Sequence, residues 1–439
     1  MQNTNIVDQG SFSALTKQQK EAVGLLSIGT FLEYFDLMLY VHMAVLLNEL
    51  FFPKSDPHTT AIYSALAFCS TYVLRPFGAL IFGWIGDTIG RKVTVIITTL
   101  MMSISCIIMA NLPTYAQIGI TATYLISICR VMQGLSSLGE IIGAQIYLTE
   151  IIKPPSRYLI VGLILSISDL GGMFALVIAS LVTVQGLNWR IAFWIGACIA
   201  VIGVIARTAL RETLEFANAK KRISKTIELC KHDPYILNNN YIIRENVNIK
   251  TALAYFLIYC ASTVSFYIAF IYCPQILKNT YSYNAEQIIH QNLLISIVGT
   301  TSGIILALIA YKVYPLKILK IKLYYSIMLA LICPLILYYC NNHGVLSIQL
   351  AFAIFWISEF PATPILLQHF PVFKRFTYPS LLFALSRACM YIVISFGIVF
   401  LVEYLNYWGL YIITIPIIIG YTFALNHFLK LEKEAESHL

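Results

Sequence analysis

A few ionisable residues lie inside long apolar stretches of the sequence, where a charge is costly to hold. These residues are Glu33, Asp36, Arg75, Arg130, Glu140, Asp169, Glu359 and Arg387. A charged side chain at the centre of an apolar segment costs about 2.5–3.5 kcal/mol on the lowest scales, and such residues commonly bind ions or protons. They are the first candidates for chemistry, although Asp169, beside two glycines, is equally consistent with close helix packing.

Polar side chains recur at helical spacing in two of these stretches. The first stretch has Glu33, Asp36 and Tyr40 at positions i, i+3 and i+7, which lie on one face of a helix. The second stretch has Arg130, Gln133, Ser137 and Glu140. We expect the two faces to meet in a central cavity, with Arg130 or Arg75 paired to an acid, because pairing offsets the cost of removing charges from water.

This pattern indicates a site that exchanges protons. We hypothesise that Glu33, Asp36 or Glu140 takes up a proton, while Arg130 is the counter-charge that releases it. A fixed ion pair that holds two helices together explains Arg75 and Glu140 equally well.

The elements that position these residues are predicted to be membrane-spanning helices. The chain of 439 residues is 59% hydrophobic and only 11% charged, with a mean hydropathy of +0.76, whereas soluble domains are about 25% charged. Runs such as residues 93–109 are apolar on every side, unlike the alternating strands of a membrane barrel. The bilayer is therefore the solvent of this fold.

The hydrophobic runs predict an all-α membrane protein with twelve transmembrane helices in two six-helix bundles. The predicted spans are residues 22–47, 61–85, 93–112, 119–149, 157–185, 190–210, 251–277, 287–311, 322–341, 345–368, 379–402 and 408–429. The expected organisation is a cytoplasmic tail at 1–21, a bundle at 22–210, a cytoplasmic loop at 211–250, a bundle at 251–429 and a cytoplasmic tail at 430–439.

The distribution of lysine and arginine predicts the orientation of these helices. Alternate loops carry the basic residues, which include Lys17, Lys20, Arg91, Lys92, Lys153, Arg157, Lys312, Lys317, Lys320, Lys322, Lys374 and Arg375. Basic loops remain in the cytoplasm, so both termini are expected there. The first 20 residues are polar and do not resemble a cleavable signal peptide.

Several other classes of protein find little support in the sequence. The residues behind the net charge of +8 lie in short loops, so nucleic acid is not an expected partner. The ten cysteines and eight histidines are dispersed, and we expect neither a metal nor another cofactor. The phosphate-binding pattern G-x-x-x-x-G-K-[ST] does not occur, so we expect neither an ATP-driven pump nor an enzyme.

The loop after the second span has a distinctive motif. Residues 83–92 read G-W-I-G-D-T-I-G-R-K, with Gly83, Asp87, Gly90, Arg91 and Lys92 in the pattern G-x-x-x-D-x-x-G-R-K. Glycines let helix ends approach closely, an aspartate favours a helix N-terminus, and the basic pair anchors the cytoplasmic side. The motif resembles the signature loop of the major facilitator superfamily. This resemblance implies two halves that give alternating access to a central site, with the loop as a conformational latch.

Further positions resemble the metabolite:proton symporter family and, within it, the proline/betaine transporters. The matching residues include Gly29, Glu33, Phe35, Asp36, Tyr40, Arg75, Pro76, Gly78, Arg130, Gln133, Gly134, Gly139, Glu140, Trp189, Arg190, Phe370, Pro371 and Arg375. The match is strong over residues 22–216 and weaker beyond them. Tyr34, Leu138 and Ala384 depart from the usual pattern, which leaves the substrate open.

The resemblance implies proton-coupled uptake of a small zwitterionic osmolyte such as proline or glycine betaine. The expected partners are this solute, protons and the lipid bilayer, and we expect a monomer in the inner membrane of a bacterial cell. A proton symporter of 2-oxoglutarate or citrate remains an alternative. Because residues 310–317 lack the glycines and the acid of the loop at 83–92, a uniporter or a transporter-like sensor also remains open.

Aromatic residues, which make up 13% of the chain, are the expected binding surface for a quaternary ammonium group. The candidate substrate-binding residues are Tyr34, Phe35, Tyr40, Gln133, Tyr259, Tyr267, Phe355 and Trp356. Most aromatic residues of membrane proteins pack against other helices or lie at the membrane interface, so packing is the competing interpretation for each ring.

Overall fold

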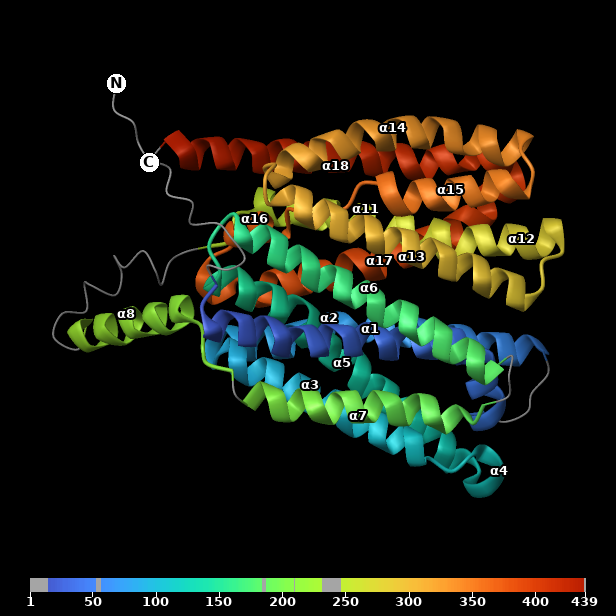
Figure 1. Cartoon of the computed structure of the whole chain (residues 1–439), viewed down its shortest axis with the longest axis horizontal. Coiled ribbons are helices and arrows are strands. Elements are labelled where there is room, and N and C mark those ends of the chain that lie inside the picture. The colour runs from blue at the N-terminus through green and yellow to red at the C-terminus, as the bar shows by residue number, and fades with distance from the viewer. Residues whose placement is uncertain (1–14, 53–56, 184–186, 209, 231–245, 438–439) are drawn as a thin grey trace.

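The computed structural model describes residues 15–52, 57–183, 187–208, 210–230 and 246–437, and within these residues the chain is helical with no strand. A backbone that crosses a bilayer must satisfy its own hydrogen bonds, and a helix does so within one segment. The long helices lie side by side in two groups (Figure 1). We call these groups the first and the second bundle.

The first bundle is built from the N-terminal helices. They are α1 (Lys17–Phe51), α2 (Pro57–Thr88), α3 (Arg91–Asn111), the short α4 (Tyr115–Ile118), α5 (Ile120–Ile151), α6 (Ser156–Thr183) and α7 (Trp189–Thr208). In this bundle α1 packs against α6, α2 against α5, and α3 against both α5 and α7. The next helix, α8 (Leu214–Cys230), lies beyond the ends of the long helices (Figure 1).

The second bundle is built from the C-terminal helices. They are α11 (Ile249–Tyr267), a π-helical turn (Ile268–Tyr272), α12 (Cys273–Tyr281), α13 (Ala285–Ala310), α14 (Pro315–Tyr339), α15 (Asn342–Phe355), α16 (Thr363–Gln368), α17 (Thr377–Leu405) and α18 (Leu410–Ser437). Here α11 packs against α17 and α18, and α13 packs against α15. The two bundles meet along α2 with α17 and along α6 with α13.

The lengths and surfaces of these helices suit a bilayer. Within the part of the chain that the structure describes, nine helices are long and apolar enough to cross a membrane, and two shorter apolar helices cover 189–205 and 342–355. Large apolar side chains such as Ile202, Ile305 and Phe400 are exposed on the outside of the bundles. The helices are consistent with the twelve predicted spans.

One end of the molecule carries most of the loop cations, and we call it the basic end. The start of α1, the end of α18 and the whole of α8 lie at this end (Figure 1). Its basic residues include Lys17, Arg91, Lys153, Lys317 and Arg375. The opposite end, which contains α4 and the end of α12, is the distal end (Figure 1).

Helices extend into the tails that the sequence analysis assigned. Helix α1 begins at Lys17, inside the expected tail 1–21, because Thr16 and Gln19 form reciprocal side-chain to backbone hydrogen bonds of 3.2 and 2.9 Å. Helix α18 continues to Ser437, through most of the expected tail 430–439, in a stretch rich in the helix-forming residues Glu, Lys and Ala.

The predicted tenth span, 345–368, is not one helix. Helix α15 ends at Phe355 and α16 begins at Thr363. Pro361 lacks a backbone N–H donor and disfavours helix at the residue before it, so the chain runs irregularly between the two helices. Pro364 lies in the first turn of α16, where proline is tolerated. The prediction of a continuous span was therefore wrong, although the apolar length was correct.

The irregular segment is stable in an apolar setting because side chains satisfy its carbonyl groups. Ser326 donates a hydrogen bond to the carbonyl of Phe355 at 3.1 Å, and Tyr421 donates to that of Ser358 at 2.7 Å. Unpaired backbone groups at this depth are costly, so these bonds allow a break next to the bundle centre.

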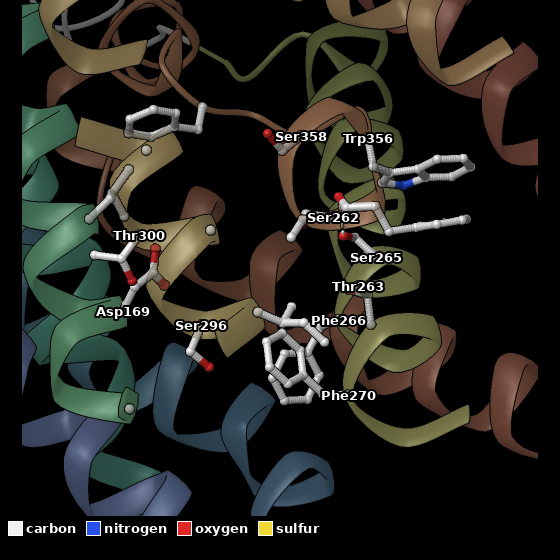
Figure 2. Close-up of a pocket in the computed structure, with 18 of the residues that line it drawn as sticks. Asp169, Ser262, Thr263, Ser265, Phe266, Phe270, Ser296, Thr300, Trp356 and Ser358 are labelled. Atoms are coloured by element: carbon white, nitrogen blue, oxygen red, sulfur yellow. Dashed lines mark hydrogen bonds between the residues drawn. The ribbon is translucent and has the colours of Figure 1, made fainter. Parts of the chain in front are cut away.

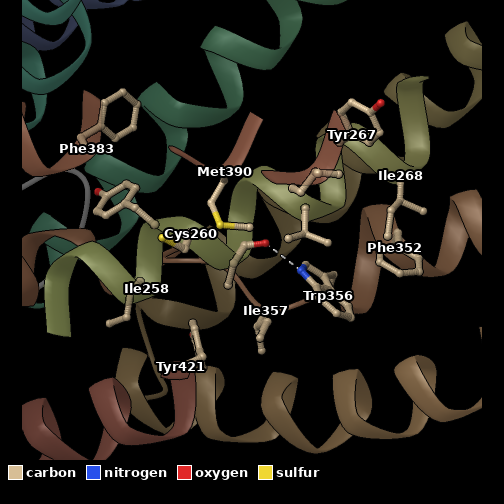
Figure 3. Packing of buried hydrophobic residues seen from close by; sticks show 14 of the residues in the cluster. Ile258, Cys260, Tyr267, Ile268, Phe352, Trp356, Ile357, Phe383, Met390 and Tyr421 are labelled. Carbon is tan, nitrogen blue, oxygen red and sulfur yellow. Dashed lines mark hydrogen bonds between the residues drawn. The ribbon is translucent and has the colours of Figure 1, made fainter. Parts of the chain in front are cut away.

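Trp356 anchors the same segment in the core of the second bundle. Its indole Nε1 donates a hydrogen bond to the carbonyl of Ala261 at 2.8 Å, drawn as the dashed line in Figure 3. Its ring stacks on Phe352 with ring centres 4.7 Å apart. A buried tryptophan needs such a partner for its N–H group, so the indole fixes the position of the break relative to α11.

Candidate functional site

A cavity of about 330 Å³ lies between the two bundles. The first bundle contributes residues of α1, α2 and α6, and the second contributes residues of α11, the π-helical turn, α13, α14, α15, the irregular segment and α17. Figure 2 shows part of its lining, with Asp169 and Thr300 on one side and Ser262, Ser265 and Trp356 on the other. Such a position at the meeting of two halves suits a binding site.

Four ionisable residues line this cavity. They are Asp169 on α6, Lys322 on α14, Glu359 in the irregular segment and Arg387 on α17. None of the four forms an ion pair within 4.0 Å with any residue that the structure describes. The Nζ atom of Lys322 donates a hydrogen bond to Ser358 Oγ at 3.0 Å. The cavity thus presents both signs of charge without a direct ion pair among the described residues.

Lys322 corrects one assignment from the sequence, which counted it among the loop cations. Pro315 starts α14 earlier than the predicted span, because proline at the first helical position is favourable. Lys322 therefore lies about two turns inside the helix. Its charge belongs to the cavity and carries no information about orientation.

Aromatic side chains form much of the remaining wall. Three pairs of rings are in contact: Phe266 with Phe270 at 5.4 Å, Phe352 with Trp356 at 4.7 Å, and Tyr72 with Tyr391 at 4.4 Å between ring centres. Figure 2 shows Phe266 and Phe270 lying together at one side of the cavity. Rings of this kind suit alkyl groups and cations.

Small hydroxyl residues add hydrogen-bonding groups that the sequence analysis did not select. Helix α11 provides Ser262, Thr263 and Ser265, and α13 provides Ser296 and Thr300. The spacing of three residues from Ser262 to Ser265 and of four from Ser296 to Thr300 was a signal available in the sequence. Serine and threonine are, however, common in membrane helices, where their hydroxyl groups donate to the helix backbone.

Glu33 and Arg75, two predicted proton-coupling residues, form an ion pair inside the first bundle. The distance from Arg75 Nη2 to Glu33 Oε1 is 3.3 Å, and both side chains are at most 2% exposed. The pair joins α1 to α2. Neither residue lines the cavity, although their neighbours Tyr34 and Tyr72 do.

Asp36 and Arg130 form the second buried pair, at 3.6 Å, which joins α1 to α5. Gln133 donates to Asp36 and accepts from Arg130, each at 2.8 Å. The guanidinium of Arg130 lies 3.8 Å from the centre of the Tyr40 ring. A single network behind the cavity wall thus contains Asp36, Arg130, Gln133 and Tyr40. The side chain of Glu140, another predicted proton-coupling residue, lies outside the described residues.

The predicted substrate-binding residues are only partly at the cavity. Tyr34 and Trp356 line it. Phe35 is buried in the core of the first bundle, and Tyr259 and Tyr267 are buried in that of the second. Phe355, which is 42% exposed, packs against Tyr325 on α14.

The motif at 83–92 connects the bundles at the basic end. The carboxylate of Asp87, at the end of α2, accepts hydrogen bonds from the backbone N–H groups of Phe376 and Thr377 at 2.9 and 2.8 Å. It also accepts one from the Thr377 hydroxyl at 2.7 Å. Since these groups belong to the first turn of α17, a carboxylate of one bundle caps a helix of the other.

Charged groups extend this connection. Arg91 donates to the carbonyl of Val372 in the second bundle at 2.6 Å and lies 3.3 Å from Glu150 in the first. Arg375 approaches the same Glu150 at 3.4 Å and Glu215 on α8 at 2.7 Å. The side chain of Glu150 is fully buried between the two arginines, so the network closes the basic end.

The glycines of the motif allow this closeness. A Cβ atom added at Gly83 would lie 2.6 Å from the Cα of Thr377, and one at Gly86 would lie 2.5 Å from the Phe376 ring. Real Cβ atoms do not approach other atoms so closely. A side chain at Gly83 would have to displace the backbone of α17.

Gly90 and Lys92 act within the first bundle. Gly90 has φ of 152°, and a Cβ atom there would collide with Glu212. The Glu212 carboxylate accepts hydrogen bonds from the N–H groups of Arg91 at 3.1 Å and Lys92 at 3.3 Å, which caps α3. Lys92 Nζ donates to the carbonyl of Thr208 at 3.1 Å.

Comparison with known proteins identifies the family. The family model described as the Major Facilitator Superfamily matches residues 26–398. The chain belongs to the Major Facilitator Superfamily. Its two helical bundles, central cavity and motif at 83–92 agree with this membership.

Relatives within the superfamily include named transporters. The proline/betaine transporter of Salmonella typhimurium is 29% identical over 292 residues, covering 65% of this chain and 56% of the relative. The Escherichia coli inner membrane metabolite transport protein YhjE is 34% identical over 231 residues, covering 50% of this chain and 52% of the relative. The chain thus matches little more than half the length of these relatives, and within the superfamily it resembles the proline/betaine transporters.

Solved structures support the superfamily fold. A proton:xylose symporter, XylE, bound to 6-bromo-6-deoxy-D-glucose superposes with a TM-score of 0.71 at 13% identity, covering 94% of this chain and 95% of that one. The human organic anion transporter MFSD10 superposes with a TM-score of 0.66 at 15% identity, covering 93% of this chain and all of that one. At these identities the likeness concerns the fold alone.

Proposed function

We propose that this protein is a secondary transporter that takes up a small zwitterionic osmolyte, such as proline or glycine betaine, together with protons. The observation that carries the proposal is the cavity between the bundles, which presents unpaired acidic and basic side chains between aromatic walls. A zwitterion has a matching charge of each sign. The named relatives among the proline/betaine transporters agree with this class of solute.

The aromatic walls favour the cationic part of such a solute. A cation held over an aromatic ring gains about 0.5–2 kcal/mol, more where water is excluded. Tyr34, Tyr72, Phe266 and Tyr391 provide rings at the cavity surface. The alkyl groups of proline or of a trimethylammonium also gain from burial against these rings.

The proposed mechanism is alternating access of one cavity to the two sides of the membrane. In this proposal the basic end and both termini face the cytoplasm, because basic loops remain there. The proposed setting is a bacterial inner membrane, with the protein as a monomer. The halves are residues 22–210 and 251–429, joined by a cytoplasmic loop at 211–250. Since Asp87 and Arg91 connect the bundles at the basic end, we propose that solute enters this conformation from the distal end.

The network around Asp36 is the proposed proton-coupling element. Protonation of Asp36 would remove a charge that holds Arg130, which also contacts Gln133 and the Tyr40 ring. The carboxylate and guanidinium belong to different helices, α1 and α5, so a proton changes how strongly these helices attract each other. Glu33 is a second such acid, because its protonation would likewise weaken its pair with Arg75, which joins α1 to α2.

Transport of a di- or tricarboxylate is the second candidate. Lys322 and Arg387 are two cations in the cavity, and two carboxylate groups would pair with them. Asp169 and Glu359 oppose this alternative, because each adds a negative charge that repels such a solute.

A solute panel tests the proposal. Liposomes with the purified protein are loaded in turn with proline, glycine betaine, 2-oxoglutarate or citrate, and exchange against the same labelled solute outside is measured, with protein-free liposomes as the control. We expect exchange with the zwitterions and not with the acids. Exchange with the acids alone would favour the second candidate, and no exchange with any of the four would favour a sensor.

A further inference from the structure

We infer that Asp169 and Arg387 are the two charge-recognition residues of the cavity, with Asp169 binding the cationic group of the solute and Arg387 its carboxylate. This inference rests on the proposed function, because it assumes a zwitterionic solute. It assigns the two ends of that solute to two side chains, one from each bundle.

Asp169 has the properties of a group that lacks its partner. It lies on α6, in the middle of a bilayer-length helix, and its side chain is exposed to the cavity. No described residue donates a hydrogen bond to its carboxylate or pairs with it. An unpaired carboxylate in such a segment costs free energy. A ligand with a cationic group would bind favourably there, because it supplies the partner that the protein lacks.

Arg387 is the complementary group on α17. Its guanidinium packs on the ring of Phe383 at 4.4 Å, and its Nε atom is buried without a hydrogen-bond partner. No carboxylate of a described residue lies within 4.0 Å of it. Arginine binds carboxylates through two parallel N–H groups, so a solute carboxylate would satisfy donors that the cavity leaves open.

The other two charges of the cavity are less suited to this role. Lys322 is committed to Ser358, a contact that tethers the irregular segment to α14. Glu359 belongs to the second bundle, as Arg387 does, so a solute held by these two residues would not join the bundles. Asp169 and Arg387 remain as the acid and the base through which a solute can join the bundles.

The position of the two residues links binding to conformation. Asp169 belongs to the first bundle and Arg387 to the second. A solute that contacts both residues joins the bundles, and either bundle alone holds only one of its charges. Opening the cavity by separating the bundles therefore dissociates at least one end of the solute.

Three ligands of similar size separate the two charges in an experiment. Glycine betaine has both charges, choline has only the cation, and 3,3-dimethylbutyrate replaces the betaine nitrogen by carbon and has only the carboxylate. Binding to purified protein is measured by displacement of labelled glycine betaine, and by isothermal titration for variants that bind it weakly. We expect Asp169→Asn to weaken the binding of glycine betaine and of choline about tenfold or more, as for loss of a charge-assisted contact. The binding of 3,3-dimethylbutyrate should be unchanged.

Arg387→Gln should give the opposite pattern, with weaker binding of glycine betaine and 3,3-dimethylbutyrate and unchanged choline. Glu403→Gln is the matched control, since Glu403 is an exposed carboxylate on the same helix as Arg387, outside the cavity lining. If one variant fails to fold, the other still tests the inference, because each variant is expected to keep wild-type binding of a different ligand.

Two results would overturn the inference. If the wild type binds glycine betaine and both variants bind all three ligands as the wild type does, or lose all three equally, the assignment is wrong while the proposed function stands. If the wild type binds neither glycine betaine nor proline, the zwitterionic substrate class fails, and the inference fails with it.

Discussion

The carboxylate of Asp87 accepts two hydrogen bonds from Thr377, one from its backbone N–H at 2.8 Å and one from its hydroxyl at 2.7 Å. Asp87 ends α2 in the first bundle, and Thr377 begins α17 in the second. A loop motif that is recognisable in the sequence is therefore the place where one half of the molecule caps a helix of the other. In the proposed alternating access, this contact would exist only while the basic end is closed.

Asp87→Asn should weaken this closure. An amide has one acceptor oxygen and no charge, whereas hydrogen bonds to a charged group each contribute about 1.5–3 kcal/mol. We expect the uptake rate to fall about tenfold or more while the protein remains folded in detergent. Thr377→Ala, which removes one of the three donors, should have a smaller effect. Wild-type uptake by Asp87→Asn would show that the contact does not limit transport.

Gly83→Ala should impair the same closure by steric means. Its Cβ atom would lie 2.6 Å from the Cα of Thr377, so the backbone of α17 must move. The control is Gly24→Ala on α1, where a Cβ atom meets nothing within 4 Å. We expect slow uptake for the first variant and near wild-type uptake for the second, measured at equal amounts of protein in the membrane. Equal rates for both variants would contradict the close approach.

Asp36→Asn should separate proton coupling from solute exchange. The amide can still accept the hydrogen bond from Gln133, but it cannot titrate. We expect accumulation driven by a pH gradient to be lost, while exchange of internal for external solute, which needs no net proton movement, persists. Glu403→Gln serves as a control for removal of a carboxylate. If Asp36→Asn still accumulates solute in response to pH, Asp36 does not carry the proton.

Tyr421→Phe should destabilise the irregular segment between α15 and α16. The variant leaves the carbonyl of Ser358 without the hydrogen bond that Tyr421 donates at 2.7 Å, which costs about 1–3 kcal/mol for a buried group. Thermal unfolding of the purified protein should therefore begin at a lower temperature. Tyr404→Phe is the matched control, since that side chain is 80% exposed. Equal unfolding temperatures for the two variants would argue that the carbonyl has another partner.

Much of the fold was predictable because the bilayer makes a simple demand on sequence. A run of apolar residues of sufficient length must become a helix, and the polar residues between runs must become loops. The break between Phe355 and Thr363 escaped this reasoning because residues 345–368 are mostly apolar. Pro361 was a local signal, but prolines also occur inside continuous helices here, as Pro76 does in α2.

The candidate site was less predictable, because a cavity depends on how helices pack. Helical spacing placed Glu33 and Asp36 on one face, and the structure pairs them with Arg75 and Arg130. Spacing alone did not reveal that these pairs lie behind the wall of the cavity. Lys322 escaped selection because the start of α14 was placed too late by hydropathy.

The most direct test of the account is accumulation of labelled glycine betaine by purified protein in liposomes with an imposed proton gradient, acidic outside. The account predicts an internal concentration above the external one, and loss of that excess when a protonophore collapses the gradient. Equilibration without accumulation, or accumulation that the protonophore does not affect, would contradict proton-coupled uptake.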